Sequence, residues 1–158
     1  MRPIEKNLER LRATAREFRL AIEHLDRSVL PVTFENFPRG SCGDAVLLLG
    51  TYLLDNGYGE FGYVLGERGD HQANTWSSHT WLEKQNLVVD ITADQFPEIS
   101  DKVIVCLDSE WHRQFNGKIE HKADYRIYDS RTAASLNNVY NEILKYMQEH
   151  NNLLEPTP

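Results

Sequence analysis

Two helical patterns enclose a central stretch with a different hydrophobic period, and this change limits the folds open to the chain. Apolar residues recur every three or four positions at about 5–27 and 132–150, which predicts amphipathic helices. Between them, short runs rich in β-branched and aromatic residues predict strands at 61–67, 78–84, 86–92 and 102–108, with 125–129 as a candidate fifth. Helices that enclose a run of strands predict an α+β fold.

A third helix is expected at about 42–54, where apolar residues cover most of the helix circumference and predict burial on most sides. It follows the glycine-flanked sequence Gly-Ser-Cys-Gly-Asp at 40–44 and ends at an Asn-Gly pair, which is typical of helix ends. Farther along, the connection at 83–87 predicts a tight hairpin. The strands on either side of it would then pair antiparallel.

The length of 158 residues suits one domain and is too short for two ordinary ones. We therefore expect a single domain over residues 1–158, with its core at about 30–128. The net charge of −7 argues against general nucleic-acid binding, which needs a basic surface. Because Cys42 and Cys106 are the only cysteines, the chain is not a disulfide-stapled secreted scaffold.

The N-terminal residues are charged throughout and lack the apolar segment of a signal peptide. The longest uninterrupted apolar stretch, at 45–49, is far shorter than the about 20 residues that a membrane helix needs. We therefore expect a cytoplasmic protein without a membrane partner, in which a free thiol stays reduced. The sequence leaves the oligomeric state open.

Cys42 is expected at or beside the first turn of the third helix. Unpaired backbone N–H groups and the helix dipole stabilise negative charge there, which favours the nucleophilic thiolate. Gly40 and Gly43 would let a substrate backbone approach the sulfur closely. The alternative is a small core cysteine that happens to start a helix, because free cysteine is among the most buried residue types.

His79 and Asp90 are candidates for the base and the orienting acid that a thiolate enzyme needs. His79 opens one strand of the expected hairpin and Asp90 ends the other, so antiparallel pairing brings them to the same rim of the sheet. A carboxylate after an apolar run also needs a partner if it is buried. The alternatives are a surface histidine and a turn-forming aspartate at a strand end.

The order of these motifs resembles a known family. A cysteine at a helix start, followed by SHTWLE at 78–83 and LVVDITADQF at 87–96, is similar to the transglutaminase-like branch of the papain-like thiol enzymes. The resemblance covers about residues 38–96. It implies a papain-like core in which the cysteine-bearing helix packs on an antiparallel sheet, with flanking helices at both ends of the chain.

The resemblance also implies a Cys-His-Asp triad: Cys42 as nucleophile, His79 as general base and acid, and Asp90 as the residue that orients it. Such a triad implies an amide hydrolase or acyl transferase that forms a thioester on Cys42 and needs no cofactor. A peptide, protein or glutamine-like amide is the implied substrate. Two alternatives remain: a leader-peptide-processing protease that works with a partner protein, and a non-catalytic binding module that retains the fold.

An oxyanion would be bound by the backbone N–H of Cys42 and by a side-chain donor. Asn36, six residues upstream, and Gln95, beyond the acid strand, are the candidate donors. Trp76 lies in a polar loop where it could contact a substrate. Trp81 is the second candidate contact, although strand alternation puts it on the face of His79, where packing beside the site is expected.

A zinc site made from Cys42, His71, His79 and His112 is conceivable, but these residues have no short ligand spacing such as Cys-x2-Cys or His-x3-His. We therefore expect no metal ion. Cys106 falls inside an apolar run and is expected to be a buried strand thiol.

Overall fold

The structure is a computed structural model that describes residues 2–151. Its helices and strands alternate irregularly along the chain. In order they are α1 (Pro3–His24), α2 (Cys42–Asp55), β1 (Gly62–Arg68), β2 (Ser77–Lys84), β3 (Leu87–Asp90), β4 (Ile104–Leu107), α3 (Glu110–Arg113), β5 (Lys118–Lys122) and α4 (Ser130–Asn151). The α+β prediction is confirmed, and the three long helices and first four strands begin and end within a few residues of their predicted limits.

The prediction of a fifth strand at 125–129 is wrong. Tyr125–Ile127 form a turn of 3-10 helix, because the Asp124 carboxylate accepts the backbone N–H of Arg126 at 2.9 Å and closes the chain into a turn. The fifth strand is β5, which the sequence pattern hides. Its side chains are almost all exposed, Ile119 to 61%, so no apolar alternation marks it.

The five strands form one antiparallel sheet in the order β4-β3-β2-β1-β5. Gln85 and Asn86 connect β2 to β3 as a two-residue turn with φ angles of 48° and 64°. Positive φ at both positions is the geometry of the hairpin turn that matches the twist of paired strands. The predicted hairpin is therefore confirmed, with Leu82 opposite Val89.

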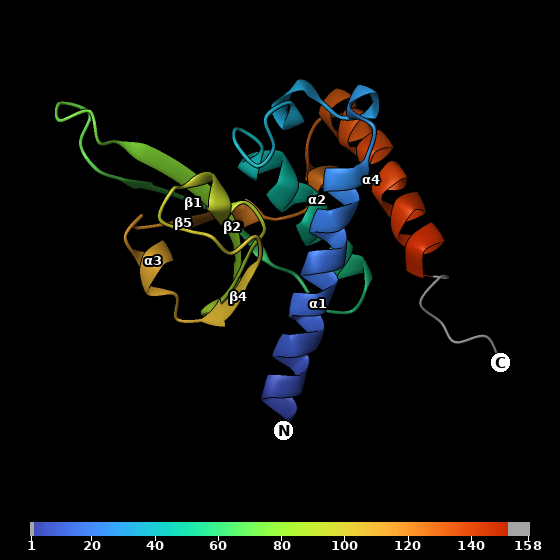
Figure 1. Ribbon diagram of the computed structural model, residues 1–158, viewed down its shortest axis with the longest axis horizontal. Helices are drawn as coiled ribbons and strands as arrows, with labels where there is room; N and C mark the ends of the chain where they lie inside the picture. Colours follow the sequence, from blue (N-terminus) through green and yellow to red (C-terminus); the bar gives the residue numbers. More distant parts are fainter. Residues whose placement is uncertain (1, 152–158) are drawn as a thin grey trace.

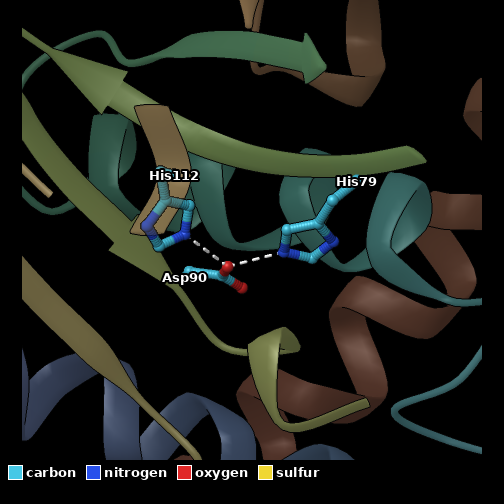
Figure 2. A group of neighbouring side chains, drawn as sticks. All are labelled: His79, Asp90 and His112. Atoms are coloured by element: carbon cyan, nitrogen blue, oxygen red, sulfur yellow. Dashed lines mark hydrogen bonds and ion pairs between the residues drawn. The ribbon is translucent and has the colours of Figure 1, made fainter. Parts of the chain in front are cut away.

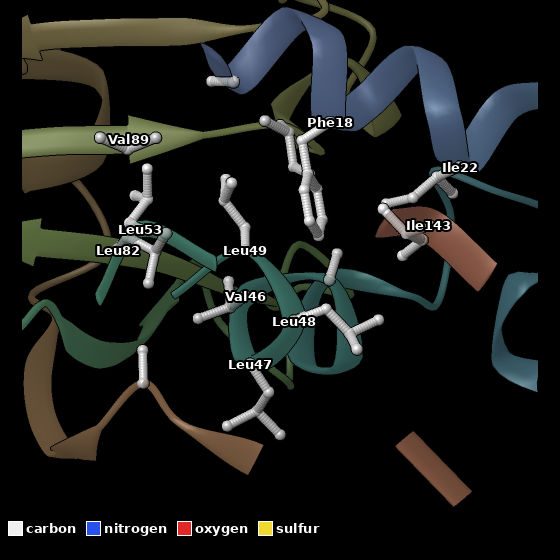
Figure 3. Close-up of a cluster of buried hydrophobic side chains, with 14 of the residues drawn as sticks. Phe18, Ile22, Val46, Leu47, Leu48, Leu49, Leu53, Leu82, Val89 and Ile143 are labelled. Atoms are coloured by element: carbon white, nitrogen blue, oxygen red, sulfur yellow. The ribbon is translucent and has the colours of Figure 1, made fainter. Parts of the chain in front are cut away.

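The two faces of the sheet are covered by different elements. The three long helices lie on one side and the short helix α3 on the other (Figure 1). On the helix side, mainly aliphatic side chains from α1, α2, α4 and the sheet form the main core, together with a few aromatic ones such as Phe18 (Figure 3). The opposite side has a smaller aromatic cluster, made of Val64, Trp81, Val88 and Phe115, with Phe96 and Trp111 packed against it.

Strand alternation distributes the side chains of β2 between these two faces. Leu82 belongs to the main core that packs on α2, whereas Trp81 belongs to the aromatic cluster. His79 shares the face of Trp81, and their rings lie 5.9 Å apart. The hairpin therefore carries His79 to the rim of the sheet on the aromatic side, near the start of α2.

Across residues 2–151, the structure contains no helix with the length and apolar character needed to cross a membrane.

Candidate functional site

His79 and Asp90 are in direct contact at the rim of the β2–β3 hairpin. His79 Nε2 lies 2.6 Å from Asp90 Oδ2, and the two side chains are 0% and 1% exposed (Figure 2). Because Leu82 pairs with Val89, the register puts Asp90 beside Trp81 and diagonally opposite His79, on one face of the sheet. The hairpin thus brings together two residues that are eleven positions apart in the sequence.

The Asp90 carboxylate has hydrogen-bond donors on both of its oxygens. Oδ1 accepts the backbone N–H of Thr92 at 2.8 Å and the Thr92 hydroxyl at 3.3 Å. Oδ2 accepts from His79 and from His112, whose Nε2 lies 2.8 Å away. Burial by itself raises the pKa of Asp90, but the charges and N–H donors of the two histidines lower it well below its ordinary value. Asp90 is therefore a buried, ionised carboxylate.

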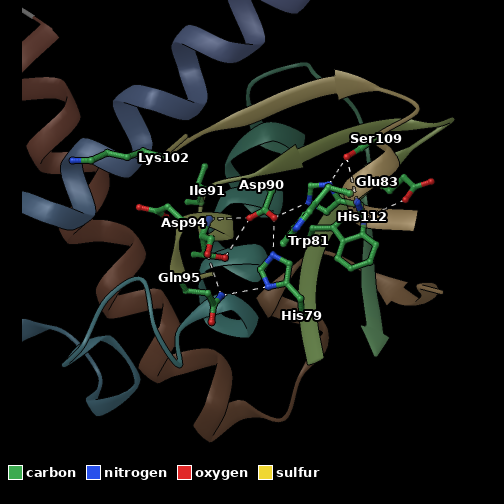
Figure 4. Close-up of polar contacts among 12 residues, drawn as sticks. His79, Trp81, Glu83, Asp90, Ile91, Asp94, Gln95, Lys102, Ser109 and His112 are labelled. Atoms are coloured by element: carbon green, nitrogen blue, oxygen red, sulfur yellow. Dashed lines mark hydrogen bonds and ion pairs between the residues drawn. The ribbon is translucent and has the colours of Figure 1, made fainter. Parts of the chain in front are cut away.

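The second ring nitrogen of His79 faces a different set of groups. The Gln95 side-chain amide lies 3.3 Å from His79 Nδ1 and also donates to the Thr92 carbonyl at 3.0 Å (Figure 4). These partners assign the proton of the neutral ring to Nε2, which donates to Asp90, and leave a lone pair on Nδ1. Nδ1 is then the nitrogen available to accept a proton from a neighbouring thiol.

Cys42 is the first residue of α2, and its thiol is half-buried beside His79. Burial raises the pKa of this thiol, but the His79 imidazole and the backbone N–H of Thr80 lower it by more than burial raises it. The net shift of the Cys42 pKa is therefore downward. The position of Cys42 at the start of α2 also favours a lowered thiol pKa, because the helix dipole stabilises negative charge there.

His79 responds in the opposite direction. Burial lowers its pKa, but the charge and hydrogen bond of Asp90, together with Cys42, raise it to about 9. A thiolate on Cys42 and an imidazolium on His79 therefore stabilise each other, and the two groups titrate as a coupled pair.

Aromatic rings enclose the His79 imidazole. The rings of Phe96, Trp111, Phe115 and Trp81 lie 5.1, 5.7, 5.8 and 5.9 Å from it, between ring centroids. Exclusion of water strengthens electrostatic interactions inside such an enclosure. The contact between His79 and Asp90 is thus better shielded from solvent than a surface ion pair.

Arg19 of α1 fixes the segment that follows Asp90. Its guanidinium donates to the carbonyl of Ile91 at 2.8 Å and to the Asp94 carboxylate at 2.8 Å, and Arg19 is only 4% exposed. This segment carries Gln95 (Figure 4). The position of Gln95 at His79 therefore depends on a long-range contact with the first helix.

The remaining predicted contacts lie in different places. Asn36 is an exposed turn residue, and no side-chain hydrogen bond within residues 2–151 links it to Cys42 or His79. Trp76 lies in the loop between β1 and β2, is 40% exposed and stacks on His71 at 4.5 Å. Trp81 is 2% exposed inside the aromatic cluster, so its ring packs beside the site rather than facing solvent.

Two residues at the site were not expected beside the triad: His112 was considered only as a zinc ligand, and Tyr63 was not considered. His112 reaches Asp90 from α3, a single turn whose four residues give no periodic signal. Tyr63 was hidden in the pattern of β1, and its hydroxyl lies beside Gly43. A Cβ atom at Gly43 would lie 3.1 Å from Tyr63 Oη, so the missing side chain is what lets this hydroxyl approach the first turn of α2.

The conceivable zinc set, which sequence spacing argued against, does not assemble, since His71 stacks on Trp76 in an exposed loop. Instead, within the described part of the chain, nitrogens of His79 and His112 and an oxygen of Asp90 lie within 4.8 Å of one another, close enough to share a metal ion. Zinc needs about 2.0–2.2 Å to each ligand atom. The Asp90 oxygen lies 2.6 Å from His79 Nε2 and 2.8 Å from His112 Nε2, which is direct hydrogen-bonding distance. It would have to move away from the two nitrogens to admit an ion.

The fold and site together define an α+β protein with a buried His-Asp pair beside a helix-start thiol. Comparisons with protein-family models, curated proteins and solved structures find no match to this chain.

Proposed function

We propose that this chain is a thiol enzyme, an amide hydrolase or acyl transferase in which Cys42 is the nucleophile. His79 acts as the general base and acid, and Asp90 orients His79. The observation that carries the proposal is the fully buried contact of 2.6 Å between His79 Nε2 and Asp90, which leaves Nδ1 of the ring free of the carboxylate. The His79 side chain also interacts with the Cys42 thiol and lowers its pKa. The packing of α2 on an antiparallel sheet supports a papain-like core of the transglutaminase-like kind.

In the first step, the Cys42 proton passes to His79 Nδ1 and the sulfur attacks the carbonyl carbon of the substrate. The S–C bond forms as the electron pair of the carbonyl π bond moves to oxygen. When the oxyanion collapses, the C–N bond breaks, and the leaving nitrogen takes the proton from the His79 imidazolium. Asp90 stays ionised and holds the ring through Nε2–H.

In the second step, water or an amine attacks the thioester on Cys42. His79 removes the proton of the incoming group, the C–S bond breaks, and the thiolate is restored. Water gives hydrolysis or deamidation, and an amine gives transfer. A peptide or glutamine-like amide is the proposed acyl donor, because a half-buried thiol of lowered pKa beside a general base can attack an amide carbonyl.

The oxyanion needs hydrogen-bond donors near the sulfur. The backbone N–H of Cys42, at the open end of α2, is one proposed donor. The Gln95 amide is the better supported side-chain donor, because it lies 3.3 Å from His79 Nδ1, the ring nitrogen that does not contact Asp90. Asn36 is less well supported, since its side chain is exposed and has no described contact with this site.

Alkylation by iodoacetamide tests the proposal, because it reports the thiolate directly. At pH 6 we expect the native protein to be labelled at Cys42 about 100-fold faster than at Cys106, and we expect His79→Ala to lose most of that rate. Peptide mapping by mass spectrometry separates the two cysteines within one sample, so Cys106 serves as the internal control.

His24→Ala is the matched control variant, because His24 is exposed at the end of α1. It should leave the Cys42 rate unchanged. If Cys42 in the folded protein reacts no faster than Cys106, the enzymatic proposal fails. A non-catalytic binding module would then be the better interpretation of the site.

A further inference from the structure

In the proposed mechanism Asp90 acts only through its contact with His79, and a second buried histidine, His112, has no role. His112 is 2% exposed, and its Nε2 lies 2.8 Å from the same Asp90 oxygen that His79 contacts (Figure 2). Buried polar groups in such a place are expensive unless they are fully hydrogen-bonded. An apolar side chain of similar size would fill the space without that requirement, so the histidine calls for an explanation.

The proton positions on His112 follow from its neighbours. Its Nδ1 lies 2.6 Å from the Ser109 hydroxyl, and that hydroxyl oxygen also accepts the backbone N–H of His112 at 3.4 Å. The Ser109 hydroxyl therefore donates its own proton to His112 Nδ1, because its oxygen already accepts a hydrogen bond from the backbone N–H of His112. The His112 ring then carries its proton on Nε2 and donates it to Asp90.

The two histidines thus present matching tautomers to one oxygen. The resulting order of groups is Gln95, His79, Asp90, His112 and Ser109, linked by contacts of 3.3, 2.6, 2.8 and 2.6 Å (Figure 4). Thr92 holds the other Asp90 oxygen. With both oxygens engaged, the carboxylate cannot rotate without breaking a buried hydrogen bond.

The outer end of this chain of groups faces a small cavity. Ser109 and His112, together with Trp81 and Glu83, line a pocket of about 210 Å³ on the α3 side of the sheet. The Asp90 end is sealed, because the Asp90 and His79 side chains are 1% and 0% exposed. His112 therefore separates the carboxylate from solvent and supplies a donor at the same time.

We propose that His112, set by Ser109, is a positioning residue that holds Asp90 ionised and oriented toward His79. This proposal rests on the proposed thiol chemistry for its effect on Cys42, but its structural part stands without it. Leu fills the space and donates nothing, whereas Gln can place its side-chain amide near the position of His112 Nε2. The pair His112→Leu and His112→Gln therefore separates hydrogen bonding from packing.

Two readouts on the full-length protein test the proposal. In ¹⁵N-histidine-labelled protein, proton NMR should show two exchange-protected imidazole N–H signals. His112→Gln should remove one and keep the other at its position, and His112→Leu should shift or broaden the survivor. For Cys42 alkylation at pH 6, we expect His112→Leu to slow the rate about tenfold and His112→Gln to restore it to within about threefold of the wild type.

Ser109→Ala is the second variant, because it removes the donor to Nδ1 and leaves the His112 ring in place. We expect its imidazole N–H signals to change while the protein stays folded. The positioning role is overturned if His112→Leu leaves both the His79 N–H signal and the Cys42 rate unchanged. It is also overturned if the native protein binds one equivalent of added Zn²⁺ and loses both N–H signals, which would make the cluster a metal site.

The two proposals fail in different ways. An unreactive Cys42 in the wild type would contradict the enzyme, yet the NMR comparison would still report whether His112 holds Asp90. If wild-type Cys42 reacts rapidly and His112→Leu changes neither the His79 N–H signal nor the Cys42 rate, only the positioning role is contradicted.

Discussion

The two faces of the sheet are built in opposite ways. The helix-covered face is a large, mainly aliphatic core in which residues such as Leu48, Leu49 and Leu53 are almost completely buried. The α3-covered face has a small aromatic cluster that surrounds ionised and hydrogen-bonded groups. Aliphatic burial stabilises the fold wherever it occurs, whereas buried charges stabilise only when each has its partners. The first face should therefore determine stability, and the second face should determine reactivity.

A core truncation gives the largest expected change in stability. Leu49 is 1% exposed in α2, so Leu49→Ala removes buried methyl groups and leaves a cavity. We expect the free energy of unfolding, measured with urea, to fall by about 3 kcal/mol, and the Cys42 alkylation rate of the folded protein to stay unchanged. Leu20→Ala, at a position 48% exposed on α1, is the matched control and should have little effect.

Arg19 joins the two faces, because it extends from α1 to the segment after Asp90. Arg19→Met keeps the apolar stem but removes the donors to Ile91 and Asp94. We expect a loss of about 2 kcal/mol in the free energy of unfolding and a slower Cys42 reaction, because Gln95 is no longer fixed. Arg16→Met changes an exposed arginine on the same helix. Equal effects of the two variants would contradict the link between the faces.

The pH dependence of stability should come from the aromatic face. The pKa of His79 is raised from its ordinary 6.5 to about 9, so the stability it contributes is fully present below about pH 6.5 and is lost as the pH rises through about 9. The expected loss is about 3 kcal/mol, measured by urea unfolding from pH 6 to pH 10. His79→Gln should flatten this part of the profile, and an unchanged profile would contradict the shifted pKa.

Asp90 should affect stability at the acidic end of the pH range. Its pKa is lowered in the folded protein, so its contribution is present above the ordinary carboxyl pKa and is lost as the pH falls toward the lowered value. Leu49→Ala should shift the whole stability profile downward without changing its shape, because no charged group is altered.

The smallest expected effect concerns Gly43. A methyl group there would lie 3.1 Å from Tyr63 Oη, so Gly43→Ala pushes the hydroxyl away by a few tenths of an ångström. We expect about a twofold change in the Cys42 alkylation rate and no measurable change in stability. Tyr63→Phe is the comparison variant. If Gly43→Ala alters the rate while Tyr63→Phe does not, the contact between these residues is not the cause.

The parts of the fold and site that sequence could predict are those set by local interactions. The β2–β3 hairpin follows from a two-residue turn, and that turn alone brings His79 to Asp90. The start of α2 at Cys42 also follows from local pattern. By contrast, β5 is an exposed edge strand held by pairing with β1, so its own residues do not reveal it.

His112 shows why the rest of the site could not be predicted. Its contact with Asp90 spans 22 positions and depends on how β4 and α3 return across the sheet. The same holds for Arg19, whose contact with Asp94 spans 75 positions. Gln95 differs from both, because it follows the acid strand directly and was a candidate from sequence alone, whereas the other candidate, Asn36, lies in an exposed turn before the helix.

Formation of an acyl group on Cys42 tests the central claim most directly. The folded protein is mixed with p-nitrophenyl acetate, and intact mass together with peptide mapping reports where acetyl groups are attached. We predict a rapid burst of nitrophenolate equivalent to one site per chain, with the acetyl group on Cys42, and loss of the burst in Cys42→Ala and His79→Ala. A burst that survives Cys42→Ala, or acetylation that reaches Cys42 no faster than Cys106, would contradict the account.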